Sequence, residues 1–119
     1  MGDSEPGSVR ATPVVLHVLL SLAGADAHAY GIMKDIDDRT GGRLSVGPGS
    51  LHYTLTRLLS TRLIEEVDVS PADAPDDARR KYFRMTGAGR RVLESELSVW
   101  ADVVEIARAR RLIPGREGA

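Results

Sequence analysis

Residues 47–59 have the sequence GPGSLHYTLTRLL, which predicts a helix with two unlike faces. Pro48 stands at a first-turn position, where its missing N–H leaves no hydrogen bond unmade. Leucines recur at helical spacing and predict a buried stripe of Leu51, Leu55, Leu58, Leu59 and Leu63. At about 100° per residue, the opposite face is predicted to carry Ser50, Tyr53, Thr54, Arg57 and Ser60. Because that face lacks the Glu/Lys ladder of a merely solvated helix, we expect it to contact a partner.

Two further helices are predicted to precede this stretch. The first begins after Thr12, which caps it, has Pro13 at its first position and ends at Gly24. The second covers about residues 28–40 and ends at the glycine pair that begins with Gly41, because glycine readily takes a positive φ.

Beyond the central helix the period of the sequence changes. Residues 63–69 (LIEEVDV) partly alternate apolar with acidic side chains, and residues 81–85 (KYFRM) are short and aromatic-rich. They predict two antiparallel strands, joined as a hairpin by a loop that carries two prolines. A last helix is predicted to begin after Thr86 and to extend to about Leu112. It carries an apolar seam longer than a small core needs, formed by Leu93, Leu97, Trp100, Val104 and Ala107.

The order helix, helix, helix, hairpin, long helix is that of a winged helix-turn-helix with one extra helix. The expected fold class is therefore mainly α with a small β-hairpin. We assign residues 12–86 to the winged helix-turn-helix and residues 87–112 to the C-terminal helix, with flexible segments over 1–11 and 113–119. In this architecture the third helix presents its outer face to the major groove of double-stranded DNA, which is about 12 Å wide.

Composition limits the function further. The 119 residues are 42% apolar and 28% charged, which fits one soluble globular domain. There is no cysteine, and the three histidines fall on three different predicted elements, so we expect no metal site. The sequence has no nucleophile–base pair or phosphate loop, so we expect neither an enzyme nor a cofactor. Its longest apolar run is too short for a membrane span and its N-terminus lacks a secretory charge pattern, so we expect a cytoplasmic protein.

The charges are segregated, although the net charge of −1 does not by itself indicate nucleic acid. Residues 79–91 contain six basic side chains and no acid, whereas residues 65–77 contain six acids and no base. The basic cluster predicts contact with phosphates along the second strand and the start of the last helix. In a winged helix-turn-helix the hairpin is the wing, and Arg80 and Lys81 are its candidate contacts with DNA. Strand alternation places them on opposite faces, so we expect only one of them to reach DNA directly.

Two segments carry a resemblance to a known family. They are HAYGIMKDIDDRTGGRLSVGPGSLHYTLTRLLSTRLIEE, residues 28–66, and RRKYFRMTGAGRRVLESEL, residues 79–97. The chain thereby resembles the PadR family of bacterial transcriptional regulators over residues 14–112. The resemblance implies a winged helix-turn-helix homodimer that represses transcription and dimerises through its C-terminal helix. A single C-terminal helix is similar to the short-tailed branch, some members of which bind flat hydrophobic effectors near the dimer interface. The sequence departs from the family at His52 and Tyr53, where Tyr and then often Pro are usual.

The residues leave alternatives open at single positions. Arg57 is the candidate for reading a base, against a phosphate contact or an ion pair within the chain. Trp100 either anchors the dimer interface or forms a wall of an effector pocket. The candidate DNA contacts are Ser50, Tyr53, Thr54, Arg57, Arg80 and Lys81. The candidate residues of the dimer interface or effector pocket are Leu93, Leu97, Trp100 and Val104.

The function expected from these observations is sequence-specific binding of double-stranded DNA. A homodimer would bind a palindromic operator whose half-sites lie about one helical turn, ~34–36 Å, apart, and a small hydrophobic effector would release it. Two alternatives are a winged-helix module that binds protein and a regulator of another winged-helix family. An acidic or apolar outer face on the third helix would favour the protein-binding module, and Ser50, Thr54 and Arg57 do not provide one.

Overall fold

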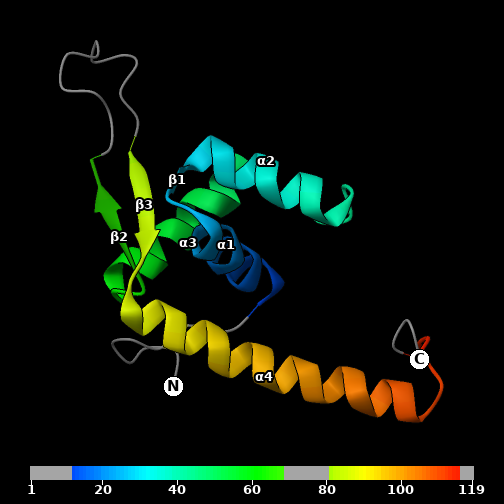
Figure 1. Ribbon diagram of the computed structural model, residues 1–119. Helices are drawn as coiled ribbons and strands as arrows, with labels where there is room; N and C mark the ends of the chain where they lie inside the picture. Colours follow the sequence, from blue (N-terminus) through cyan, green and yellow to red (C-terminus); the bar gives the residue numbers. More distant parts are fainter. Residues whose placement is uncertain (1–11, 69–80, 116–119) are drawn as a thin grey trace.

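Helices and a small antiparallel sheet form the body of the chain, and one long helix extends away from it (Figure 1). The structure is a computed structural model and describes residues 12–68 and 81–115. Within these ranges the elements are α1 (Pro13–Gly24), β1 (Ala27–His28), α2 (Ala29–Thr40), α3 (Pro48–Ser60), β2 (Ile64–Val67), β3 (Tyr82–Met85) and α4 (Gly87–Ala109). This is the predicted winged helix-turn-helix order, mainly α with a small sheet and a long last helix.

Short-range chemistry fixes the ends of the helices. Thr12 caps α1, because its hydroxyl oxygen accepts a hydrogen bond from the Val15 N–H at 3.2 Å. Thr86 caps α4 in the same way, through the Gly89 N–H at 3.1 Å. At the end of α2, Gly41 has a φ of 61°, the left-handed conformation that glycine adopts most easily. These three predictions are confirmed, whereas α4 ends at Ala109, earlier than the expected Leu112.

The sheet has the strand order β1-β3-β2, with both pairings antiparallel. Phe83 pairs with Ala27 on one side and with Glu66 on the other. The two expected strands are therefore present and paired. The prediction was incomplete, because it lacked β1, a third strand that joins the sheet from the segment before α2. A strand of two residues has no periodicity for a sequence pattern to reveal, and its hydrogen-bond partner lies more than fifty residues away.

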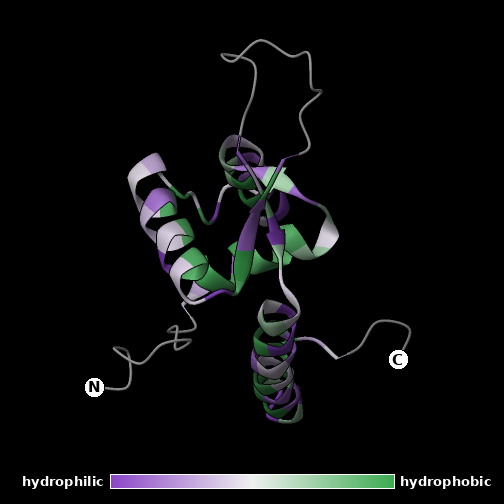
Figure 2. Cartoon of the chain, turned by 90° about the vertical axis from the view of Figure 1, so that its left-hand side faces the viewer, coloured by the Kyte–Doolittle hydropathy of each residue, from purple (hydrophilic) through white to green (hydrophobic). Residues whose placement is uncertain are grey.

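The core lies where the first three helices meet the sheet. Figure 2 shows hydrophobic residues gathered there, and a mixture of hydrophobic and hydrophilic residues along α4. The largest fully buried side chains are Val18, Leu19, Ile32, Ile36, Leu51, Leu58 and Ile64. Leu55 is also buried and Leu59 is partly buried, so the predicted leucine stripe is confirmed for the leucines of α3. Leu63 is buried too, but it lies beyond the end of α3 at Ser60, so the prediction that it belongs to the helix is wrong. Packing of this stripe holds α3 on the body and leaves its other face outside.

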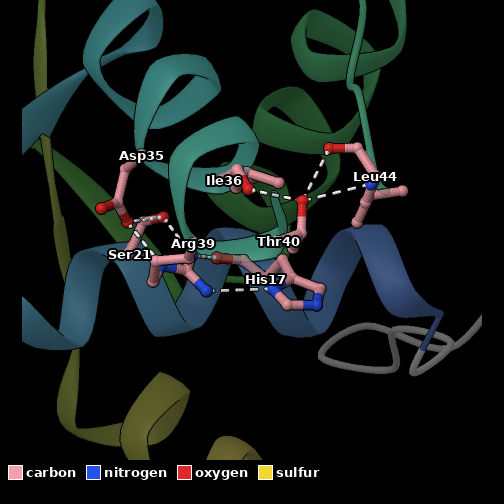
Figure 3. A network of polar contacts seen from close by, with 7 residues as sticks. All are labelled: His17, Ser21, Asp35, Ile36, Arg39, Thr40 and Leu44. Atoms are coloured by element: carbon pink, nitrogen blue, oxygen red, sulfur yellow. Dashed lines mark hydrogen bonds and ion pairs between the residues drawn. The ribbon is translucent and has the colours of Figure 1, made fainter. Parts of the chain in front are cut away.

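Arg39 joins α2 to α1 through a small polar network (Figure 3). Its guanidinium donates to the Ser21 hydroxyl at 2.7 Å and to the His17 backbone carbonyl at 3.0 Å. It also lies 2.8 Å from Asp35 and 3.0 Å from the His17 Nδ1. Since a guanidinium has no lone pair to offer, Nδ1 must accept and the ring is neutral. Burial and the positive charge of Arg39 accordingly lower the pKa of His17.

We expect the stability of the chain to fall as the pH drops below the ordinary histidine pKa of 6.5. A lowered pKa in the folded state means that the unfolded state binds the proton more tightly, so the stabilisation is present above that value and is lost below it. Thermal unfolding of the wild type and His17→Gln at pH 7.5 and 5.5 measures this effect. The drop in Tm should be smaller in the variant, whose side chain does not titrate.

His52→Gln serves as the matched control, since it removes an exposed histidine that takes no part in the network. It should keep the wild-type dependence on pH. An equal drop in Tm for the wild type and His17→Gln would contradict the assignment.

Candidate nucleic-acid interface

The outer face of α3 is polar and accessible. Gly49, Tyr53, Thr56 and Ser60 are exposed, and Tyr53 retains 63% of its accessible surface. On one flank of this face lies His52, which is exposed, and on the other lie Ser50 and the half-buried Arg57. No acidic residue occurs in α3, so the face offers hydroxyls, an imidazole and a guanidinium without a like charge to repel phosphates.

One residue predicted for this face does not lie on it. Thr54 is only 7% exposed, so the prediction that it lies on the outer face is wrong. At 100° per residue Thr54 lies about 60° from Leu51 and about 40° from Leu58, which puts it at the edge of the buried stripe. The outward direction instead includes Thr56, which the sequence reasoning missed. Measured from the midpoint of the predicted five-leucine stripe, the two threonines lie at nearly the same angle, about 100° to either side. Only the midpoint of the buried Leu51, Leu55 and Leu58 separates them, with Thr54 about 65° away and Thr56 about 135° away.

Tyr53 and Arg57 are paired one helical turn apart. The Arg57 guanidinium donates to the Tyr53 hydroxyl at 3.3 Å and lies 6.0 Å from the centroid of its ring. This contact aligns the guanidinium along α3 and over an aromatic face. The arrangement presents the planar donor group of Arg57 next to the exposed phenol.

The described part of the wing carries fewer free cations than the sequence count indicates. Lys81 is exposed, with its ammonium group 3.7 Å from the Glu66 carboxylate. Arg84 makes two hydrogen bonds to Asp26, at 2.8 and 3.2 Å, which lower the pKa of Asp26. Arg84 therefore ties β3 to the segment before β1. Arg80, the other predicted wing contact, lies outside the described residues.

The far part of α4 exposes an apolar surface, which we call the α4 face. It consists of Leu97, Val99, Trp100, Val103 and Ile106, which are 37–57% exposed. Val104 is half-buried. Leu93 is only 3% exposed and packs in the core of its own chain, so the prediction that it belongs to the dimer interface or effector pocket is wrong. The first turns of α4 cover the body of the chain, and only its later turns leave apolar side chains outside.

Other kinds of site find little support in the described residues. Among residues 12–68 and 81–115, no group of three or more His, Asp or Glu side chains is placed to hold a metal ion. No helix within the described part of the chain is long and apolar enough to cross a membrane. The arrangement offers polar recognition by α3 and apolar association by α4.

Comparison with known protein families matches residues 15–95 to the transcriptional regulator PadR-like family. The match covers α1 to the first turns of α4 and well over half of the chain. This chain belongs to the PadR-like family. The resemblance drawn from the sequence motifs is thereby confirmed, and the chain is a transcriptional regulator of that family.

Solved structures of PadR-like proteins have the same fold. A PadR family regulator from Clostridium difficile is 22% identical, with a TM-score of 0.69 over 82% of this chain and 97% of that one. A PadR-like transcription factor from Bacteroides fragilis is 27% identical, with a TM-score of 0.65 over 81% and 87%. Bacillus subtilis PadR, solved in complex with operator DNA, is 16% identical, with a TM-score of 0.61 over 72% of this chain and 47% of its own.

Proposed function

We propose that this PadR-like regulator is a homodimeric repressor that binds double-stranded DNA through α3. The observation that carries the proposal is the outer face of α3, polar and free of acids, on a helix whose opposite face is locked into the core. The major groove, about 12 Å wide, admits one such helix. The Bacillus subtilis relative bound to operator DNA favours the same use of the fold here.

Base reading is assigned to Arg57, with Ser50, Tyr53 and Thr56 beside it. A guanidinium bonds the O6 and N7 of guanine together, which a phosphate contact does not require. The Tyr53 contact directs Arg57 along α3, so its donors are partly ordered before DNA arrives. Lys81, at the described end of the wing, is assigned to phosphate. The site of action is the cytoplasm, where the target DNA lies.

Dimerisation is assigned to the α4 face. Five apolar side chains at least one-third exposed form a surface that a second copy would bury. A two-fold axis along this surface would present two α3 helices to a palindromic operator, with half-sites about 34–36 Å apart. A small hydrophobic effector held at this interface, with Trp100 as anchor or wall, would change the separation of the two helices and release the operator.

Replacing Arg57 with Ala should reduce the preference for the operator over random DNA. The loss should be about 1–3 kcal/mol for each half-site, roughly 5- to 150-fold each, because one bidentate base contact disappears from each protomer. Fragments selected from genomic DNA by the wild type supply the operator, and fluorescence anisotropy gives both affinities. Arg110→Ala removes an exposed arginine at the far end of α4 and should leave the preference unchanged. An unchanged preference in Arg57→Ala would exclude base reading by this residue.

Replacing Lys81 with Gln should weaken binding to operator and random DNA alike. Each phosphate contact contributes about 0.9 to the slope of log K against log salt. Because the proposed dimer carries two copies of Lys81, the slope should become shallower by about 1.8. Lys34→Gln is a close control, since Lys34 is also exposed and also lies near a carboxylate, Asp38, at 3.6 Å. Titrations from roughly 50 to 200 mM salt compare the slopes of the two variants. Equal slopes would rule out a phosphate contact of Lys81.

Replacing Trp100 with Glu should convert the dimer into a monomer, because it places a charge within the α4 face. Trp100 is 46% exposed in the single chain, so the fold itself should persist, as circular dichroism will show. The control Ser98→Glu adds the same charge on the side of α4 that lies about 160° around the helix from Trp100, and it should remain dimeric. Sedimentation velocity measures both. A dimeric Trp100→Glu would exclude this interface.

A further inference from the structure

A cavity of about 570 Å³ lies between the start of α2, one flank of α3 and the sheet. In Figure 1 the start of α2 lies beside β3, next to β1, and α3 lies behind them. Ligand pockets typically measure about 300–1,000 Å³ and are mostly apolar with a few polar groups. This cavity fits that description, since Met33, Leu51, Leu55, Leu59 and Phe83 form its apolar wall. It is separate from the α4 face, because no residue of α4 lines it.

One polar group on the wall is held in a defined orientation. The Nδ1 atom of His28 accepts a hydrogen bond from the Gly31 N–H at 3.0 Å, which caps α2. In the neutral ring the proton therefore resides on Nε2, which is a donor. Tyr30 stacks on this ring with centroids 6.5 Å apart, and Tyr82 contacts it edge-on at 5.2 Å. The cap and the two aromatic contacts fix the donor in place before any ligand binds.

The charges on the wall favour a neutral ligand. Lys81 and Glu66 line the cavity together, with their charged groups 3.7 Å apart. An anion would approach the Glu66 carboxylate, and a cation would approach the Lys81 ammonium. Either ligand would meet a like charge next to the opposite one. An uncharged molecule avoids this repulsion and still contacts the apolar wall.

We propose that this cavity binds an uncharged aromatic molecule whose hydroxyl or carbonyl oxygen accepts a hydrogen bond from His28 Nε2. Its ring contacts Met33, Leu55 and Phe83, where aromatic and sulfur contacts add to apolar burial. His52 and Thr56, on the flank and outer face of α3, also line the cavity. A bound molecule therefore contacts α3 directly and weakens its binding to DNA. This regulatory consequence rests on the proposed function, whereas the binding itself does not.

Binding is tested on the full chain, isotope-labelled, by titration with 2-naphthol as the probe and amide chemical shifts as the readout. Saturable shifts are expected at Gly31, Leu55 and Phe83. The variant His28→Asn removes the ring donor but keeps a capping side chain, and it should weaken the affinity by up to about tenfold. His17→Asn makes the same substitution outside the cavity and should bind as the wild type does. Shifts confined to the α4 face, or an affinity unchanged in His28→Asn, would overturn the proposal.

Thr56→Phe provides a second variant that leaves His28 and the core untouched, because Thr56 is exposed at the edge of the cavity. The added ring should occupy part of the cavity and reduce naphthol binding. Unchanged naphthol binding in Thr56→Phe would overturn the placement of the ligand in this cavity.

A final experiment tests the effect on DNA binding. Saturating naphthol should weaken DNA binding by the wild type more than by His28→Asn. An equal effect on both would overturn the regulatory consequence. If the chain bound no DNA, the chemical shifts would still report the cavity, so the two failures are distinguishable.

Discussion

The direction in which α4 leaves the sheet depends on a close approach between Gly89 and the start of β2. Thr86 donates its N–H to the Leu63 carbonyl at 3.0 Å and its hydroxyl to the Arg62 carbonyl at 2.8 Å. Its hydroxyl oxygen also caps α4. A Cβ at Gly89 would overlap the same Leu63 oxygen and lie 2.9 Å from the side chain of Met85. Only glycine lets the first turn of α4 come this near.

This junction also connects α4 to α3. The Leu63 N–H donates to the Leu58 carbonyl at 2.9 Å. Leu63, whose carbonyl accepts the hydrogen bond from Thr86, is therefore also bonded to the last turn of α3. Leu58 is fully buried and Leu93 of α4 joins the same core. The orientation of the proposed dimer helix is thus set against the proposed recognition helix through a few backbone atoms. In a two-fold dimer that orientation determines how far apart the two α3 helices lie, and hence the spacing of half-sites.

Features that depend on neighbouring residues were predictable from the sequence, and features that depend on distant ones were not. Thr12, Thr86 and Gly41 act on their own helix ends, and the leucine stripe follows from helical period alone. By contrast, β1 exists only because β3 pairs with it, and the Arg84–Asp26 pair joins residues 58 positions apart. The prediction for Thr54 was wrong for another reason. The predicted leucine stripe included Leu63, which lies beyond the end of α3, and this shifts the centre of the stripe away from Thr54.

Ion pairs within the chain would also limit how strongly the proposed interface attracts DNA. Of the four described cations in the basic cluster, Lys81, Arg84 and Arg90 each lie within 4.0 Å of a carboxylate. DNA phosphates must compete with these carboxylates, and the net charge of −1 adds no general attraction. Under the proposed function, one protomer would gain little from electrostatics alone, and two linked protomers would gain from the effective concentration of the second site. In the proposed dimer, association through the apolar α4 face would compensate for the basic side chains that are paired with carboxylates in the described part of the chain.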